Sequence, residues 1–310
     1  KKGDKIATRE AFGEGLVWLG KKNEKIVSLD AEMSNSTVAK LFSKEFPQRY
    51  FEMFIAEQNM VSVGVGLNRY GYVPFLSTFA SFLSRAHDQI RMASYNESKL
   101  CIIGSHCGLC ANGDGISQMG LEDVALFRSV QNSVVLQPSE AVSTVKLLEC
   151  MSNYSHISYM RTAKTETKVL YSPDTRFKIG GSQIVLESEK AGCTICAVGV
   201  CLFEALAAAE ELQKEGILIS VIDTYSIKPL DEETILRLAA KSKRVVTVED
   251  HYLEGGLGEA INSALIGKDI KVTNLAVRKL PKSGSVEKLM EFTEIDKAAI
   301  IKTVKQIIKN

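Results

Sequence analysis

Glu57, Phe79 and Phe82 are the residues of this sequence best suited to recognise a flat ring that contains nitrogen. Glu57 follows an edge-strand pattern at 50–56, and its apolar neighbours lead us to expect a partly desolvated carboxylate that can donate a proton to a ring nitrogen. Phe79 and Phe82 are three residues apart at the start of a predicted helix, where they would share one face and could stack on a heterocycle. Each also has a structural interpretation, because an isolated glutamate caps helices and aromatic residues at this spacing usually belong to the core.

The run from His106 to Gln118 is a glycine-dense loop that follows a buried strand pattern. Loops in this position bind ligands in α/β sheets, so we expect its polar residues to face a ligand. The run contains Gly113-Asp114-Gly115, which resembles half of a magnesium motif, but the asparagine pair that completes the motif does not follow. We therefore predict that this chain binds no metal itself.

Composition excludes several classes of function. The chain has 310 residues and a formal net charge of +1, which gives no strong electrostatic footprint for nucleic acid or anionic membrane. No apolar run approaches the ~20 residues that span a bilayer. The charged start, Lys1 to Lys5, is unlike a secretory signal, so we expect a cytoplasmic protein. The Cys-x-x-Cys pairs at 107/110 and 193/196 are predicted to be free thiols.

Apolar strand patterns alternate with helical patterns along the chain, which predicts an α/β fold with parallel sheets and helices on both faces. Thr8 and Ser139 are the predicted N-caps of two of the helices. The first set of expected strands is 26–29, 73–76, 100–103, 133–136 and 156–160, and the expected helices are 8–19, 57–68, 78–94, 121–129 and 139–151.

The alternation loosens between residues 162 and 189 and then restarts with a strand at 193–199. Turn residues such as Ser172-Pro173-Asp174 mark the interruption. We therefore expect two doubly wound domains, a larger one at 1–175 and a smaller one at 176–310.

Several segments in order resemble the transketolase family. They are Gly3–Arg9, Phe79–Phe82, Asp88–Ala93, Met119–Asp123, Phe127–Ser129, Arg161-Thr162 and Val248–Tyr252. The resemblance covers nearly the whole chain and implies the family's pyrimidine-binding domain followed by its C-terminal domain. The family's N-terminal domain, which grips the diphosphate through magnesium, has no counterpart here. The resemblance therefore implies the C-terminal subunit of a split transketolase of the pentose phosphate pathway type.

The resemblance also implies roles for individual residues. Glu57 would hydrogen-bond the pyrimidine of thiamine diphosphate, and Glu57 and His106 would be catalytic. Phe79, Phe82 and Glu32 would lie against the cofactor. The implied substrate residues are Arg9, Ser36, His106 and Arg161 at a sugar phosphate, with Asp114 and Gln118 at the sugar hydroxyls.

Partners follow from the same resemblance. We expect an N-terminal subunit that binds Mg²⁺ and the diphosphate, phosphorylated sugars as substrates, and a heterotetramer built around a dimer of this chain. Two alternatives stay open: the beta subunit of a 2-oxoacid dehydrogenase, which has the same layout, and a non-catalytic regulatory subunit.

Overall fold

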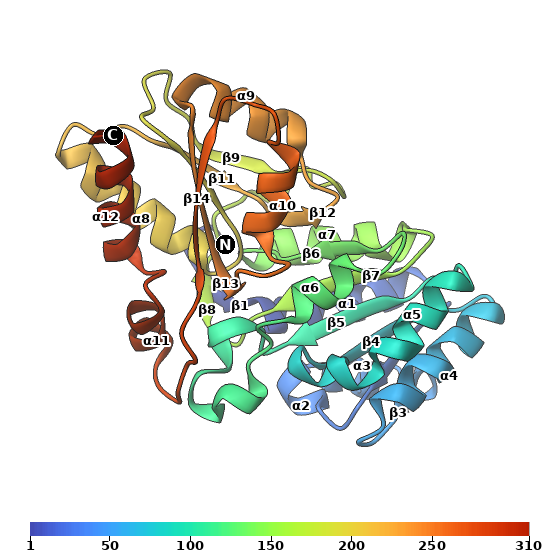
Figure 1. The fold of residues 1–310 in the computed structure, drawn as a ribbon. Helices are drawn as coiled ribbons and strands as arrows, with labels where there is room; N and C mark the ends of the chain where they lie inside the picture. Colours follow the sequence, from blue (N-terminus) through green and yellow to red (C-terminus); the bar gives the residue numbers. More distant parts are fainter. Residues whose placement is uncertain (310) are drawn as a thin grey trace.

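The computed structural model describes residues 1–309 and contains two open sheets flanked by helices (Figure 1). The larger sheet has the strand order β12-β6-β7-β5-β4-β2-β3, and every neighbouring pair is parallel except β12 with β6. Its strands are β2 (Ile26–Asp30), β3 (Tyr50–Glu52), β4 (Val73–Phe79), β5 (Cys101–Ser105), β6 (Val134–Leu136), β7 (Ser158–Thr162) and β12 (Ser226–Lys228). The predicted α/β class with parallel sheets is confirmed.

Helices cover both faces of this sheet because successive side chains of a strand point to opposite sides. Phe75 of β4 packs in the same cluster as α1 (Thr8–Lys22) and α7 (Ala141–Asn153). The next residue, Leu76, packs with the cluster of α4 (Glu57–Arg69), α5 (His87–Tyr95) and α6 (Asp123–Arg128) on the other face. Two short helices, α2 (Ser34–Thr37) and α3 (Lys40–Glu45), follow β2.

The smaller sheet has the strand order β14-β13-β10-β11-β9, and only β9 runs antiparallel to its neighbour. Helix α8 (Cys201–Lys214) packs with the C-terminal α12 (Lys297–Lys309) on one side, and α9 (Glu232–Ser242) and α10 (Leu257–Ala264) pack on the other. The strands are β9 (Gln183–Leu186), β10 (Thr194–Ala197), β11 (Ser220–Asp223), β13 (Arg244–Tyr252) and β14 (Lys271–Val277), and α11 spans Val286–Thr293.

One strand of the second half of the chain joins the larger sheet. Residues of β12 belong to the second half of the chain, yet they extend the larger sheet by pairing with β6, with Ser226 opposite Leu136. A two-stranded sheet joins β1 (Lys5–Ala7) to β8 (Glu166–Lys168). The division at residue 175 stays a prediction. The larger sheet includes β12, which comes from beyond residue 175.

Two local predictions are wrong. The helix expected at 78–94 begins as strand, because Thr78 and Phe79 pair with Gly104 and Ser105 of β5, and a 3₁₀ helix at Ser81–Ala86 precedes α5. The predicted N-caps are also displaced by one residue: Ala7 caps α1 and Glu140 caps α7. The Ser139 hydroxyl donates instead to Asp223 at 2.8 Å.

Within residues 1–309, every helix is too short or too polar to cross a bilayer. The seven cysteines carry free thiols, and the described part of the chain holds no group of three or more metal-ligating side chains.

Candidate active site at the carboxyl edge of the larger sheet

A cleft of about 500 Å³ opens where β2, β4, β5 and β7 end. The carboxyl edge of parallel strands is where open α/β sheets bind ligands. The cleft is lined by Arg9, Met33, Ser36, Phe79, Phe82, His106, Asp114, Gln118 and Lys164. Most of the residues predicted to bind cofactor or substrate are therefore brought together, and Lys164 joins them.

Three near-parallel rings form one wall of the cleft. Phe79 stacks on Phe82 with ring centroids 5.2 Å apart, and on the His106 imidazole with centroids 4.1 Å apart; the rings are tilted by 19° in both pairs. Phe79 is the last residue of β4 and Phe82 lies in the following 3₁₀ helix, so the pair meets without the helical face that the spacing predicted. The stack offers a flat apolar surface to a planar ring.

His106 follows β5 directly and has a positive φ of 55°, which turns its ring back toward the cleft side of the sheet. Burial, and then the charges of Arg9 and Lys164, lower its pKa to about 4. The imidazole is therefore neutral near pH 7. Its Nε2 lies 3.5 Å from Nη1 of Arg9 and can only accept there, which leaves the proton on Nδ1, 3.0 Å from the Ser105 hydroxyl.

Arg9 lies in the first turn of α1 and reaches across the cleft. Its Nη1 donates to the carbonyl oxygen of Ser36 at 3.2 Å, while its Nε is buried without a hydrogen-bond partner. An unmet guanidinium donor is costly when buried, and an anion in the cleft would satisfy it.

Asp114 and Lys164 face each other across the mouth, with Nζ of Lys164 3.3 Å from a carboxylate oxygen. Each side chain keeps about a third of its surface exposed, so both can exchange this contact for a polar ligand. The loop that presents Asp114 turns at Gly115, whose φ of 89° suits glycine.

The acid at the end of β2 holds the α2 segment in place. Asp30 is buried and accepts hydrogen bonds from Thr37 at 2.8 Å and Ser77 at 2.6 Å, and burial raises its pKa to about 6. The bond from Thr37 ties α2, which carries Ser36, to the end of β2. Glu32, predicted beside the cofactor, is exposed and does not line the cleft, whereas the neighbouring Met33 does.

Glu57 is the first residue of α4 and lines neither the cleft nor a second hollow of about 380 Å³, which shares Phe82 with the cleft. Its side chain is 1% exposed, and its Oε2 accepts a hydrogen bond from Nη1 of Arg85 at 2.7 Å. Arg85 is half exposed, lines the second hollow and belongs to the same 3₁₀ helix as Phe82. The Glu57 carboxylate is thus buried and paired with a half-exposed arginine.

Arg161 is not part of the cleft, and its assignment as a phosphate ligand is corrected. It lies inside β7, where strand alternation points it with Tyr159 toward α6 and the smaller unit. It is 1% exposed. Its donors are used by Asp123 at 2.8 Å, by the side chains of Gln137 and Asp250, and by the carbonyl of Gly120.

The cation that β7 does deliver to the cleft is Lys164, in the loop just past the end of the strand at Thr162. The sequence contained a signal for it: a residue beyond the strand end can reach the carboxyl edge, whereas Arg161 within the strand faces a packed surface.

Comparison with known proteins identifies the family. Residues 4–169 match the model of "Transketolase, pyrimidine binding domain", and residues 182–300 match that of "Transketolase, C-terminal domain". The chain is 48% identical to transketolase of Homo sapiens over 311 residues, which is 99% of this chain and 50% of that protein. It is 45% identical to transketolase-like protein 1 of Macaca fascicularis, over 99% of this chain and 52% of that protein.

Solved structures agree. A structure described as "Split gene transketolase, inactive beta4 tetramer" superposes with a TM-score of 0.88 at 36% identity, covering 99% of each chain. The fold also matches transketolase from Campylobacter jejuni, with a TM-score of 0.85 over 98% of this chain and 47% of that one. The chain spans about half the length of the curated relatives it matches. It belongs to the transketolase family and carries that family's pyrimidine-binding and C-terminal domains.

Proposed function

We propose that this chain is the C-terminal component of a thiamine-diphosphate-dependent transketolase that transfers a two-carbon ketol unit between sugar phosphates. The observation that carries the proposal is the cleft itself. A stack of aromatic rings lies beside two cations, and the buried Nε of Arg9 lacks a partner. A planar cofactor ring and a substrate anion together meet the needs of these groups.

The residues fit the pyrimidine end of thiamine diphosphate. Phe79 and Phe82 offer a flat surface. Glu57, at the start of α4, is a buried carboxylate that can hydrogen-bond a ring nitrogen. When bound, the cofactor would supply the electron sink for cleaving the C2–C3 bond of a ketose. Glu57 then holds or returns a proton at the ring nitrogen, which requires Arg85 to share or release the carboxylate. Glu32, whose neighbour Met33 lines the cleft, is proposed as a second cofactor contact.

The substrate would lie along the rest of the cleft. Arg9, Lys164 and Ser36 are proposed to bind the phosphate, because a guanidinium with an unmet N–H and an ammonium suit phosphate oxygens. His106, neutral near pH 7, can hydrogen-bond a hydroxyl or carbonyl oxygen of the sugar without adding charge. Asp114 and Gln118 are proposed to read the sugar hydroxyls.

Function would also require a second component. The chain spans about half of its curated relatives, so we propose that the diphosphate and its Mg²⁺ are held by the other half, as a separate subunit. Apolar residues next to Glu57 support a covering partner there: Phe54 is 66% exposed and Ile55 is 72% exposed. We propose an α2β2 assembly around a dimer of this chain, in the cytoplasm.

The test is reconstitution. The purified chain is mixed with thiamine diphosphate, Mg²⁺, xylulose 5-phosphate and ribose 5-phosphate, with and without the diphosphate-binding half. We expect ketol transfer only when both halves are present. Robust transfer by this chain alone would overturn the proposed division of labour.

A parallel reaction with pyruvate tests the 2-oxoacid alternative. The cationic cleft favours phosphorylated sugars, so we expect transfer with xylulose 5-phosphate and no decarboxylation of pyruvate. Turnover of pyruvate alone would favour the dehydrogenase type, and an inert but stable complex would favour a regulatory subunit.

A further inference from the structure

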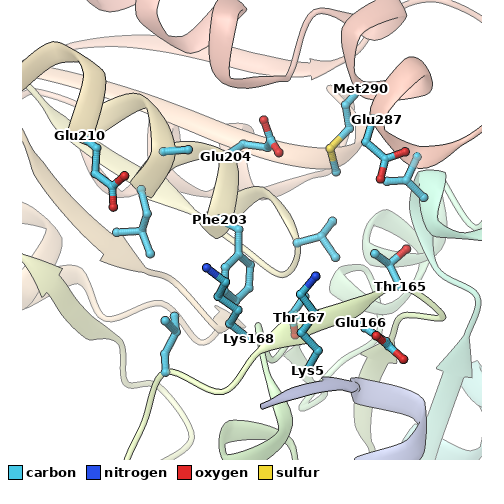
Figure 2. A pocket seen from close by; sticks show the side chains of 15 residues that line it. Lys5, Thr165, Glu166, Thr167, Lys168, Phe203, Glu204, Glu210, Glu287 and Met290 are labelled. Carbon is cyan, nitrogen blue, oxygen red and sulfur yellow. The ribbon is translucent and has the colours of Figure 1, made fainter. Parts of the chain in front are cut away.

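A third cavity, of about 430 Å³, shares no lining residue with the cleft or with the second hollow (Figure 2). It forms where the β1–β8 strand pair of the larger unit meets α8 and α11 of the smaller one. Its volume is within the range of small-molecule sites, ~300–1,000 Å³. The family roles proposed above leave this cavity without a function.

The floor of the cavity is apolar. It is made by Phe203 of α8 and by buried residues, among them Val200, Val286 and Met290. In Figure 2, Phe203 stands near the centre and Met290 at the upper right. An apolar floor with a few charged groups around it is the usual composition of a pocket for an organic ligand.

The carboxylates near the floor already have partners. Glu204 accepts a hydrogen bond from the backbone N–H of Lys297 at 2.7 Å, at the start of α12. Glu287 accepts hydrogen bonds from its own backbone N–H and from the Ser285 hydroxyl at the start of α11, which lowers its pKa. Glu210 and Glu166, the latter two residues from Lys168 in β8, also line the cavity, and both are exposed to solvent.

Two lysines on the facing wall lack such partners. Lys5 of β1 and Lys168 of β8 are direct partners in the antiparallel register, so two like charges stand opposite each other, which disfavours the pairing. Among residues 1–309, neither ammonium has a carboxylate within 4.0 Å. Figure 2 shows both lysine side chains on the cavity side of the strands.

We propose that this cavity binds a small organic anion, with its carboxylate or phosphate on the Lys5–Lys168 pair and its apolar body against Phe203 and Met290. The anion relieves the repulsion between the lysines, and the apolar body is removed from water. Because β1 and β8 belong to the larger unit and α8 and α11 to the smaller, a bound ligand also ties the two units together.

Calorimetric titration of the intact chain tests the proposal, with phenyl phosphate and phenylacetate as anionic probes and benzyl alcohol as the uncharged one. We expect saturable binding of an anionic probe, and weaker binding of benzyl alcohol. Lys168→Met should weaken the anion about threefold, and the double variant with Lys5→Met about tenfold. Whichever of the two anions binds tighter identifies the preferred head group.

Two matched variants locate the binding. Lys190→Met removes an exposed lysine elsewhere and should change nothing. Lys164→Met removes one of the two cations of the cleft and should leave the affinity of the cavity beside Lys5 and Lys168 intact. The proposal is overturned if neither anion shows saturable binding, if benzyl alcohol binds as tightly as the anions, or if binding is lost in Lys164→Met and kept in the double lysine variant.

Discussion

The cleft and the buried core between the two units hold the same kinds of side chain in different arrangements. In the cleft, Arg9, His106 and Asp114 stand with a lysine around open space. Between the units, Arg161 is enclosed with Asp123, Asp250 and His251, all of them buried. Arginine, histidine and aspartate therefore identify neither a site nor a structural network by themselves.

What differs is how the hydrogen-bond donors are used. Every N–H group of Arg161 is directed at a protein acceptor: Asp123, Asp250, Gln137 or the Gly120 carbonyl. Arg9 keeps Nε without a partner although it is buried. Asp123 Oδ1 and Asp250 Oδ2 are also buried without a partner, so the contrast concerns the donors: those of Arg161 are all used, whereas Arg9 keeps one that a ligand can accept.

The largest effect that follows from this comparison is on stability. Replacing Arg161 with methionine leaves Asp123 and Asp250 buried without their counter-ion, so we expect the free energy of unfolding to fall by about 3–5 kcal/mol. Urea denaturation of the purified variant measures it. Arg9→Met is the matched control and should cost about 1 kcal/mol. Equal losses in the two variants would contradict the distinction.

The second effect is on substrate affinity. In the reconstituted enzyme, Arg9→Met should raise the KM for xylulose 5-phosphate about 10- to 100-fold, because a charged hydrogen-bond donor to the phosphate is lost. Steady-state kinetics measure it, with Arg278→Met as an exposed control. An unchanged KM would remove Arg9 from the proposed phosphate site.

The two histidines, one in the cleft and one in the buried core, allow the two regions to be compared by their response to pH. Burial is the main cause that lowers the pKa of both His106 and His251 to about 4, so the folded chain binds fewer protons than the unfolded one. The stability they contribute is present above pH 6.5 and is lost as the pH falls toward 4. Ribose 5-phosphate should raise the pKa of His106, because the anion offsets Arg9 and Lys164, and should leave His251 unchanged.

Imidazole NMR signals recorded across the pH range, with and without the sugar phosphate, measure this difference. His106→Gln assigns the resonance. Equal responses from the two histidines would show that the ligand does not reach the cleft.

The smallest effect is expected at the mouth of the cleft. Lys164 is a third exposed and already paired with Asp114, so Lys164→Met should raise the KM about two- to fivefold. Lys164→Arg, which keeps the charge, should restore it. A larger loss than in Arg9→Met would make Lys164 the principal phosphate ligand.

The alternation of strands and helices was predictable because hydrophobic periodicity reports burial directly. Short elements were not: β12 contributes three residues to the other unit's sheet, and only tertiary pairing with β6 defines it. The prediction that a helix starts at residue 78 was wrong for the same reason, because pairing with β5 keeps Thr78 and Phe79 extended.

The cleft was largely predictable from ordered motifs, because strand ends bring Phe79 and His106 to one edge. Arg161 was wrongly assigned to the cleft because two cations, Arg161 and Lys164, lie three residues apart in this segment. Only Lys164 reaches the cleft. Choosing between Arg161 and Lys164 required knowing where β7 ends. The Glu57–Arg85 pair was not predicted, since it joins α4 to a 3₁₀ helix that the sequence pattern assigned to a longer helix.

The central claim is that Glu57 acts on a cofactor shared with a partner, and Glu57→Gln in the reconstituted enzyme tests it most directly. The variant keeps the size of the side chain but cannot exchange a proton with the ring nitrogen. We predict that kcat falls about 10²- to 10⁴-fold, with assembly unchanged by size-exclusion chromatography. A kcat within threefold of the unmodified enzyme would contradict the account.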